Sequence, residues 1–261
     1  MRKETGFRHY ERFLFGQAVI ASGHFGLIIL NRVKTGIPGL DELIEGGFPE
    51  SSSILLAGSS GTGKTIFCLE YLYKGAIDYD EPGMYATLEE GPHNLWWNMQ
   101  RFRWNFLPLQ KDNKIQILKF DPRPDDTDMD AQLSKIVEKA HEMGAKRLVI
   151  DSITALMFWT QKSEKVRYSI YNLVDQLRSI NCTTVLTCET TGGKSAVSRF
   201  GVEEFLTDGV IQLFFNPPNR AAFIRKMRGT DHSKKIHPLD INENGISIDP
   251  REEIVWESIK D

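Results

Sequence analysis

The sequence predicts an α/β protein in which a mostly parallel sheet is covered by helices on both faces. From Val33 onward, short apolar runs alternate with segments whose apolar residues recur at helical spacing. This alternation is typical of parallel strands joined by crossover helices. A glycine-rich segment also follows one of the apolar runs directly, as is expected where a strand turns into a helix.

The predicted parallel strands cover residues 54–57, 84–88, 115–120, 147–151, 183–188 and 209–215. Apolar residues within 133–143 and within 166–180 form stripes of helical period, so we expect both segments to be helices that face the core. Residues 221–248 show short strand patterns with turns at 228–230 and 243–245. This last pattern predicts an antiparallel extension of the sheet.

Length and composition favour one main domain. The chain has 261 residues, of which 41% are hydrophobic and 26% are charged, so it can bury one sizeable core. Its net charge of −3 argues against a broadly basic surface of the kind that binds nucleic acids. Cys68, Cys182 and Cys188 show no metal-ligand spacing, and we interpret them as buried thiols of a cytoplasmic protein.

The N-terminal segment 1–31 is an extension of uncertain status. Basic residues precede an apolar stretch at 18–30, but polar residues and glycines interrupt that stretch, so we expect no membrane span. Because the domain-like pattern begins at Arg32, we expect native translation to start near Leu30. The predicted division is therefore an extension at 1–31, one main domain at 32–249 and a tail at 250–261.

The glycine-rich segment is a complete G-x-x-x-x-G-K-T pattern. It consists of Gly58, Ser59, Ser60, Gly61, Thr62, Gly63, Lys64 and Thr65. The apolar run 53–57 precedes it and a helical pattern at 65–72 follows, which is the strand–loop–helix context of a nucleoside triphosphate site. Lys64 is expected to reach the β- and γ-phosphates, and the Thr65 hydroxyl to ligate Mg²⁺, so the predicted cofactors are ATP and Mg²⁺.

Acidic residues end two other predicted strands. Asp151 closes an apolar strand and is predicted to hold the metal, although a strand-ending aspartate can also be a helix cap or turn former. Glu89 and Glu90 follow the strand at 84–88, at the sheet edge where α/β proteins bind ligands. Either could position the attacking water, and the alternative is a solvated helix start.

Several motifs together resemble the KaiC-like branch of the RecA superfamily. They are the phosphate loop at 58–65, LEE at 88–90, VIDS at 149–152, SRFGVEEF at 198–205, KMRGTDH at 226–232, RVKTGIPGLDEL at 32–43 and the glycine pair at 46–47. The resemblance spans about residues 32–249 in one unbroken order. It implies a RecA-type core of the single-domain archaeal kind, usually a hexameric ring with ATP between neighbouring subunits.

The resemblance also implies roles for individual residues. Glu89 falls where the family has its catalytic carboxylate, and Glu90 falls on the adjacent position. The family's trans-acting basic segment falls on Lys226, Arg228 and His232, with Met227 and Thr230 at backbone-contact positions. Lys64 completes the expected catalytic set.

Two departures from KaiC itself limit what the resemblance implies. KaiC has two such domains in tandem, whereas this chain has one. Where the phosphorylated domain of KaiC has its Ser-Thr acceptor pair, this chain reads Glu204-Phe205, so we do not expect clock-type autophosphorylation.

Possible partners are suggested by two predicted loops. The loop at 189–199 corresponds to a channel-lining loop of RecA-like recombinases, and Phe158-Trp159 with Lys162 and Lys165 lies in the earlier loop. Aromatic residues beside cations could stack single-stranded DNA, but packing at a subunit interface explains them equally well. The pair Trp96-Trp97 is interpreted as interface or core rather than as a ligand site.

We interpret the chain as a cytoplasmic, Mg²⁺-dependent, oligomeric ATPase with a regulatory or signalling role. One alternative is a single-stranded DNA-associated paralogue of RecA-type recombinases, and another is a nucleotide-gated scaffold in which slow hydrolysis acts as a timer. A further protein partner is compatible with each of these. ATPase assays with and without single-stranded DNA, across a salt series, would separate the DNA-associated alternative from the others.

Overall fold

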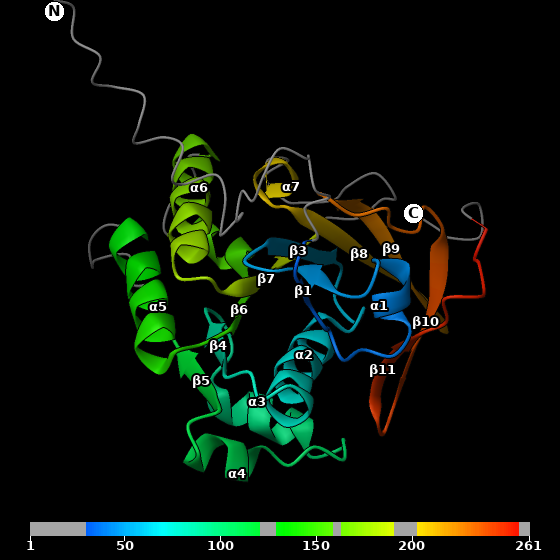
Figure 1. Ribbon diagram of the computed structural model, residues 1–261, viewed down its shortest axis with the longest axis horizontal. Helices are drawn as coiled ribbons and strands as arrows, with labels where there is room; N and C mark the ends of the chain where they lie inside the picture. Colours follow the sequence, from blue (N-terminus) through cyan, green and yellow to red (C-terminus); the bar gives the residue numbers. More distant parts are fainter. Residues whose placement is uncertain (1–29, 121–128, 159–162, 191–202, 256–261) are drawn as a thin grey trace, which may run out of the picture. The chain divides into compact units, whose positions relative to one another are not determined.

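The fold is known from a computed structural model, which describes residues 30–120, 129–158, 163–190 and 203–255. The chain divides into a short unit, Met1–Asn31, and a large unit, Arg32–Asp261. The architecture below is that of the large unit (Figure 1).

The helices of the described residues are α1 (Leu40–Leu43), α2 (Lys64–Asp78), α3 (Pro92–Met99), α4 (Phe106–Lys111), α5 (Met129–Met143), α6 (Ser163–Ser179) and α7 (Glu203–Leu206). A 3-10 helix covers Ile153–Phe158. The strands are β1 (Arg32–Val33), β2 (Phe48–Pro49), β3 (Ser53–Gly58), β4 (Gly83–Thr87), β5 (Ile115–Lys119), β6 (Arg147–Asp151), β7 (Thr183–Glu189), β8 (Gly209–Asn216), β9 (Asn219–Met227), β10 (Ile236–Asn242) and β11 (Gly245–Ile248).

Nine of the described strands form one sheet, in the order β11-β10-β9-β8-β3-β7-β6-β4-β5. The pairs from β8 to β5 are parallel, whereas β9, β10 and β11 join by antiparallel pairing. The mostly parallel sheet and its antiparallel extension are therefore confirmed. Strands β1 and β2 form a separate two-stranded sheet that the sequence did not predict.

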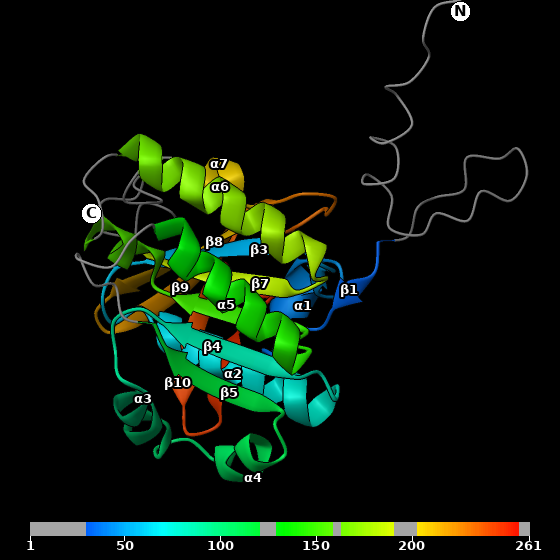
Figure 2. The same ribbon diagram turned by 90° about the vertical axis from the view of Figure 1, so that its left-hand side faces the viewer.

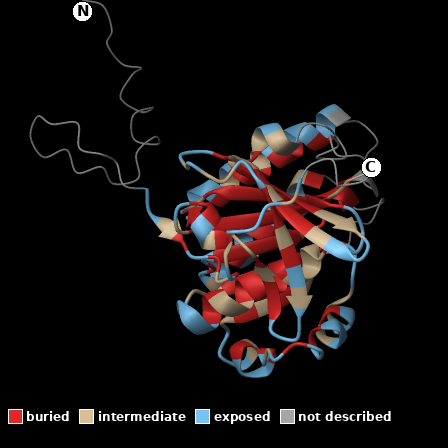
Figure 3. Cartoon of the chain, turned by 90° about the vertical axis from the view of Figure 1, so that its right-hand side faces the viewer, coloured by how far each residue is buried: buried red, intermediate tan, exposed pale blue. Residues whose placement is uncertain are grey.

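Both faces of the sheet are buried, because successive residues of each strand point to opposite sides. In β3, Ile54 and Leu56 pack on the α2 side, whereas Leu55 and Ala57 belong to the cluster formed with α5 and α6. Figure 2 shows α5 and α6 on one side of the sheet and α2 on the other. Figure 3 shows that the central strands are buried along most of their length.

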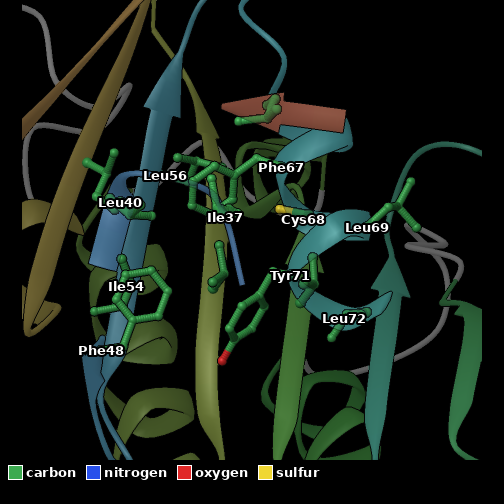
Figure 4. Packing of buried hydrophobic residues seen from close by; sticks show 14 of the residues in the cluster. Ile37, Leu40, Phe48, Ile54, Leu56, Phe67, Cys68, Leu69, Tyr71 and Leu72 are labelled. Carbon is green, nitrogen blue, oxygen red and sulfur yellow. The ribbon is translucent and has the colours of Figure 1, made fainter. Parts of the chain in front are cut away.

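The α2 side holds the larger apolar cluster, in which the helix that follows the glycine-rich loop is packed from several directions. Phe67, Leu69 and Tyr71 of α2 belong to the same apolar cluster as Leu56 of β3 and Phe48 of β2 (Figure 4). The Tyr71 and Phe48 rings lie 5.7 Å apart. This packing holds α2, and with it the loop at its start, rigidly against the sheet.

The predicted strands agree with the observed ones to within one residue at each end. All three cysteines are free and buried, as expected. Helix α3 agrees with the helix expected after Glu90, whereas α4 was not predicted, because its six residues are too few to give a clear helical period. Within the described part of the chain, no helix has the length and apolar character needed to cross a membrane.

Candidate functional site

The predicted site residues of the loop 58–65, together with Glu89, Glu90 and Asp151, lie at the edge of the sheet where the parallel strands end. Gly58, at the end of β3, pairs with Glu189 at the end of β7. Thr87, at the end of β4, pairs with Asp151 at the end of β6. Because parallel strands in register end together, the loops that follow them are neighbours, which is where open α/β sheets bind ligands.

The glycine-rich segment forms a tight loop between β3 and α2. Gly61 and Gly63 have φ values of 80° and 102°, which lie in the left-handed region that favours glycine. The Thr62 hydroxyl donates a hydrogen bond to the Ser59 carbonyl at 2.9 Å and closes the loop on itself. Helix α2 begins at Lys64, so its positive end faces the loop and favours an anion there.

Lys64 folds its side chain back over the loop. Its ammonium donates to the carbonyl of Gly58 at 2.7 Å and to that of Ser59 at 3.0 Å. These bonds hold a positive charge at the mouth of the loop. The same ammonium can exchange these carbonyls for phosphate oxygens without leaving the loop.

Asp151 lies opposite the start of α2. The Thr65 hydroxyl lies 3.5 Å from Asp151 Oδ2, and the hydroxyls of Tyr85 and Thr187 donate short hydrogen bonds to the two carboxylate oxygens. Burial, and then the charge of Asp151, raise the pKa of the Tyr85 phenol, which therefore stays protonated as a donor. The three hydroxyls fix the carboxylate in one orientation.

The oxygens of Thr65 and Asp151 fit a small divalent cation. Mg²⁺ prefers oxygen ligands and is usually held by one or two protein groups together with phosphate oxygens and water. Among the described residues, no group of three or more His, Cys, Asp or Glu side chains could hold a metal ion alone. A cation beside Asp151 would thus take its further ligands from water or from a bound nucleotide.

Glu89 and Glu90 emerge at the end of β4, and both are exposed. Ser152, directly after Asp151, donates to Glu89 Oε1 at 2.5 Å. This bond holds the Glu89 carboxylate beside the end of β6, next to Asp151. Glu90 is held through its backbone carbonyl, which accepts a bond from Thr87 at 2.7 Å. Helix α3 starts later, and its N-cap Gly91 has no side-chain hydrogen bond, so neither glutamate caps that helix.

The basic segment 226–232 lies at the other end of the sheet from the loop of its own chain. Val210 pairs with both Lys226 of β9 and Leu55, near the start of β3, whereas Leu213 pairs with Gly58 at the end of β3. Strand β9 runs antiparallel, so it carries Lys226 and the residues after it away from the phosphate loop. Within one chain, the structure therefore does not bring this segment to the loop.

The side chains of this segment differ in how they are engaged. Lys226 donates to the carbonyls of Glu204 and Thr207 at 3.0 and 2.5 Å, and burial, then the charge of Arg228, lower its pKa. Arg228 keeps 57% of its side chain exposed and lies 3.5 Å from Asp208. His232 is partly buried, and its Nδ1 lies 2.9 Å from the Ser233 carbonyl. The side chain of Arg228 is thus the most open of the three.

Arg32 braces the turn that follows β9, a contact that the sequence did not predict. Its guanidinium donates to the Thr230 hydroxyl at 2.6 Å, to the Gly229 carbonyl at 3.1 Å and to Glu45 at 3.0 Å. Glu45 in turn accepts from the backbone N–H of Asp231 at 3.0 Å. The expected backbone-contact residue Thr230 is therefore held by the segment that precedes the phosphate loop.

Sequence reasoning also missed Tyr85 and Thr187 as site residues. Thr187 carried a usable signal, since polar residues near the carboxyl ends of parallel strands face the ligand edge. Tyr85 carried none, because a tyrosine inside an apolar strand is normally a core residue. Only the fold shows that its hydroxyl reaches Asp151.

Part of the predicted partner surface lies outside the described residues. This applies to Trp159, Lys162 and the loop from 191 to 199. Trp96 packs against Phe106, with ring centroids 5.4 Å apart, whereas Trp97 is 68% exposed. The core interpretation therefore holds for Trp96 alone.

Comparison with known proteins gives consistent matches over the large unit. The family model described as "ATPase: KaiC" matches residues 33–253. A UPF0273 protein of Methanocaldococcus jannaschii is 36% identical over 238 residues, which cover 85% of this chain and 97% of that relative. The crystal structure of a KaiC-like protein from Pyrococcus horikoshii OT3 has a TM-score of 0.76 and 42% identity, and the match covers 84% of this chain and 99% of that one.

Relatives of greater length match over one part of their sequence. The circadian clock oscillator protein KaiC of Synechococcus elongatus is 36% identical over 229 residues, which cover 84% of this chain and 44% of that protein. The corresponding protein of Prochlorococcus marinus is covered to 46%. The chain thus spans less than half the length of these relatives. With the sheet order, the matches confirm the predicted RecA-like fold and the resemblance to single-domain KaiC-like proteins.

Proposed function

Because the chain belongs to the KaiC family of ATPases, we propose that it binds and hydrolyses ATP at the loop Gly58–Thr65, with Mg²⁺ as cofactor. The observation that carries the proposal is the arrangement of one edge of the sheet. There the loop, Lys64 and Thr65 face Asp151, and Glu89 is tied to the residue after Asp151. Such an arrangement suits phosphoryl transfer, in which positioning and charge stabilisation supply most of the catalysis.

The backbone N–H groups of the loop and the start of α2 would bind the phosphates of ATP. Lys64 would exchange its two carbonyl partners for β- and γ-phosphate oxygens. Thr65 and Asp151 would hold Mg²⁺, which when bound neutralises charge on the phosphates. Tyr85 and Thr187 would keep the Asp151 carboxylate in position.

Glu89 would orient the attacking water. Its carboxylate is exposed, so water can reach it, and the Ser152 hydroxyl fixes one of its oxygens. The second oxygen could then accept a hydrogen bond from the water in line with the γ-phosphate. Glu90 is the alternative, since it is the next residue after Glu89 and is also exposed.

The oligomeric part of the proposal rests on the basic segment 226–232. Its place at the far end of β9 favours action on a neighbouring subunit, because the segment cannot serve the loop of its own chain. A homo-oligomeric ring, hexameric as the family resemblance implies, would bring Arg228 and His232 of one subunit to the ATP of the next. Matches to proteins named as circadian clock oscillators favour a regulatory or signalling output over a metabolic one.

Two substitutions test the hydrolytic site. Lys64→Ala should abolish nucleotide binding, because it removes the cation at the mouth of the loop. Glu89→Gln should keep nucleotide affinity and lower turnover by at least about 100-fold, the usual effect of losing a group that activates water. Titration with a fluorescent ATP analogue and a phosphate-release assay measure the two quantities.

Glu90→Gln is the matched control, since it makes the same chemical change one residue away. Parent-like turnover in Glu89→Gln together with a loss in Glu90→Gln would transfer the role to Glu90. If the parent chain neither binds nor hydrolyses ATP in the presence of Mg²⁺, the proposed function is wrong.

A further inference from the structure

Arg32 links the segment before the phosphate loop to the turn that follows β9. It lies in β1, which pairs with β2 so that Arg32 is opposite Pro49. This small two-stranded sheet fixes the backbone of Arg32. From there the guanidinium, in a side chain that is 17% exposed, reaches Gly229 and Thr230, which follow it by 197 and 198 positions in the sequence.

The guanidinium of Arg32 is held by several acceptors at once. It donates to the Thr230 hydroxyl at 2.6 Å, to the Gly229 carbonyl at 3.1 Å and to two carbonyls within 44–47, both at 3.3 Å. Glu45 accepts a further bond at 3.0 Å and balances the charge. A planar guanidinium with acceptors on several of its donors has one fixed orientation. Arg32 is therefore a rigid brace between two distant segments.

Two hydrogen bonds in series connect Arg32 to the backbone of Arg228. The Thr230 hydroxyl accepts from Arg32 and donates to the Arg228 carbonyl at 3.4 Å. The N–H of Arg228 donates to the Asp208 carbonyl at 2.9 Å. Both backbone polar groups of Arg228 are thus held. Because side-chain rotamers depend on the backbone, these bonds restrict where the Arg228 guanidinium can reach.

Further contacts hold the residues after this turn. Glu45, which pairs with Arg32, accepts from the N–H of Asp231 at 3.0 Å. The Leu43 carbonyl accepts from the N–H of Ser233 at 2.9 Å. The turn is thus attached along its length to the segment that precedes the phosphate loop.

Two features make the orientation of Arg228 depend on this brace. Gly229, the next residue, has a φ of 65°, and glycine allows the chain many other conformations there. The contact of the Arg228 side chain with Asp208 is 3.5 Å long, and Arg228 is 57% exposed, so this ion pair contributes little to its orientation. The bonds from Arg32 therefore supply most of the restraint on the turn.

We propose that Arg32 is a positioning residue for the basic segment 226–232, which through Thr230 holds Arg228 in the orientation that reaches the ATP of a neighbouring subunit. This inference rests on the shared site of the proposed function. It assigns Arg32 to the same half of that site as Arg228, although Arg32 precedes the phosphate loop of its own chain. The chemistry addressed is the anionic triphosphate bound by a second copy of the chain.

The test is complementation in mixtures of full-length variants. Arg32→Ala is mixed in equal amounts either with Lys64→Ala, which lacks a working phosphate loop, or with Arg228→Ala, which lacks the basic group. The mixture of Arg228→Ala with Lys64→Ala is the reference. Lys34→Ala is the matched control, because Lys34 is an exposed cation two residues along the same segment. Phosphate release measures turnover, light scattering measures assembly, calorimetry measures ADP affinity and thermal unfolding identifies variants that fail to fold.

Arg32→Ala alone should lower turnover by about tenfold, because a displaced Arg228 stabilises the transition state poorly. Its ADP affinity in dilute, unassembled protein should stay within about twofold of the parent, since its own loop is distant from the change. Lys34→Ala should behave like the parent. Arg32→Lys, which keeps part of the donor set, should fall between the parent and Arg32→Ala.

The mixtures should assign Arg32 to one half of the site. With Lys64→Ala, activity should return, because about one quarter of the interfaces in an equal random mixture combine an intact loop with an intact basic segment. With Arg228→Ala, activity should not return, since every interface then lacks a working basic segment.

Parent-like turnover in folded Arg32→Ala would overturn the inference. So would a mixture with Lys64→Ala that gains nothing while the reference mixture recovers, because a merely structural loss gives that pattern. Recovery with Arg228→Ala would also overturn it, since Arg32 would then belong with the loop. If Arg32→Ala does not fold, Arg32→Lys replaces it in the same mixtures. Failure of the reference mixture, where mixed rings form, would instead refute the shared site of the proposed function.

Discussion

Glu70 places a carboxylate inside the core, on the helix that begins with Lys64. The residue is 1% exposed, and its Oε2 accepts a hydrogen bond from the backbone N–H of Ile246 at 2.6 Å. Burial raises the pKa of Glu70 from 4.5 to about 7, although the Ile246 bond and Lys74 act in the opposite direction. The group is therefore a buried acid whose charge is costly near neutral pH.

The direction of this shift determines how Glu70 affects stability. In the folded chain the acid stays protonated up to about pH 7, whereas in the unfolded chain it ionises near pH 4.5. Its contribution to stability is thus fully present below pH 4.5 and is lost as the pH rises through about 7. Between low pH and a pH well above 7, the titration of Glu70 lowers the free energy of unfolding by roughly 3 kcal/mol.

Glu70→Gln should remove this pH dependence, because glutamine can still accept the Ile246 bond but cannot ionise. Urea unfolding at pH 5 and pH 8 should show that the parent loses stability relative to the variant as the pH rises. Other titrating groups are common to both chains, so the difference between them isolates Glu70. Identical pH profiles would show that Glu70 does not titrate in this range.

At the level of elements, the β10–β11 hairpin supports the phosphate-loop helix. Ile246 at the start of β11 bonds Glu70, and a Cβ added to Gly63 would lie 2.8 Å from Ile241 of β10. The hairpin turn also contacts the segment before α4, where Trp104 Nε1 donates to the Asn244 carbonyl at 3.2 Å. The antiparallel extension thus positions the loop as well as enlarging the sheet.

Gly245→Ala should destabilise the chain by about 2 kcal/mol or more, because it combines backbone strain with a steric clash. Gly245 has a φ of 125°, and a Cβ there would overlap with the Glu70 carboxylate. Gly144→Ala is the control, since Gly144 also has a positive φ, 67°, but a Cβ added there would meet no heavy atom within 4 Å. Chemical denaturation should show a smaller loss for Gly144→Ala, and equal losses would refute the predicted clash.

In the molecule as a whole, the two ends of the sheet carry the two halves of the proposed shared site. The phosphate loop, Asp151 and Glu89 lie at the carboxyl ends of the parallel strands. Arg228 follows the end of β9, near the amino ends of those strands. In a head-to-tail ring, one half of each subunit can meet the complementary half of its neighbour.

Arg228→Ala should fold normally, since a largely exposed arginine contributes little to stability, but it should lose ATPase activity and nucleotide-dependent assembly. Mixing it with Lys64→Ala should restore activity, because each variant supplies the half that the other lacks. In an equal random mixture, about one quarter of the interfaces would be intact. Phosphate release and light scattering measure the two effects.

Each variant measured alone at the same total concentration is the control for this mixture. A mixture that forms mixed rings yet is no more active than the separate variants would argue against a shared site. The basic segment would then act on a different partner.

The fold class, the parallel strands and the phosphate loop could all be predicted from the amino-acid sequence alone. These features depend on local information, because the period of apolar residues reflects strand and helix geometry, and the G-x-x-x-x-G-K-T spacing reflects one loop conformation. The sequence also predicted that Asp151 and Glu89 lie at strand ends, and parallel strands share one ligand-binding edge. It did not predict that Ser152, the residue after Asp151, donates a hydrogen bond to Glu89.

Which distant residues meet became clear only from the tertiary structure. Tyr85 reaches Asp151, Arg32 holds Thr230, and Arg220 holds Gly61 across 159 positions of the sequence. Arg147, predicted simply as the first residue of a strand, is fully buried against Tyr71 and Glu81. Such contacts depend on sheet order and register, which arise from packing of the whole chain, so no local pattern in the sequence could reveal them.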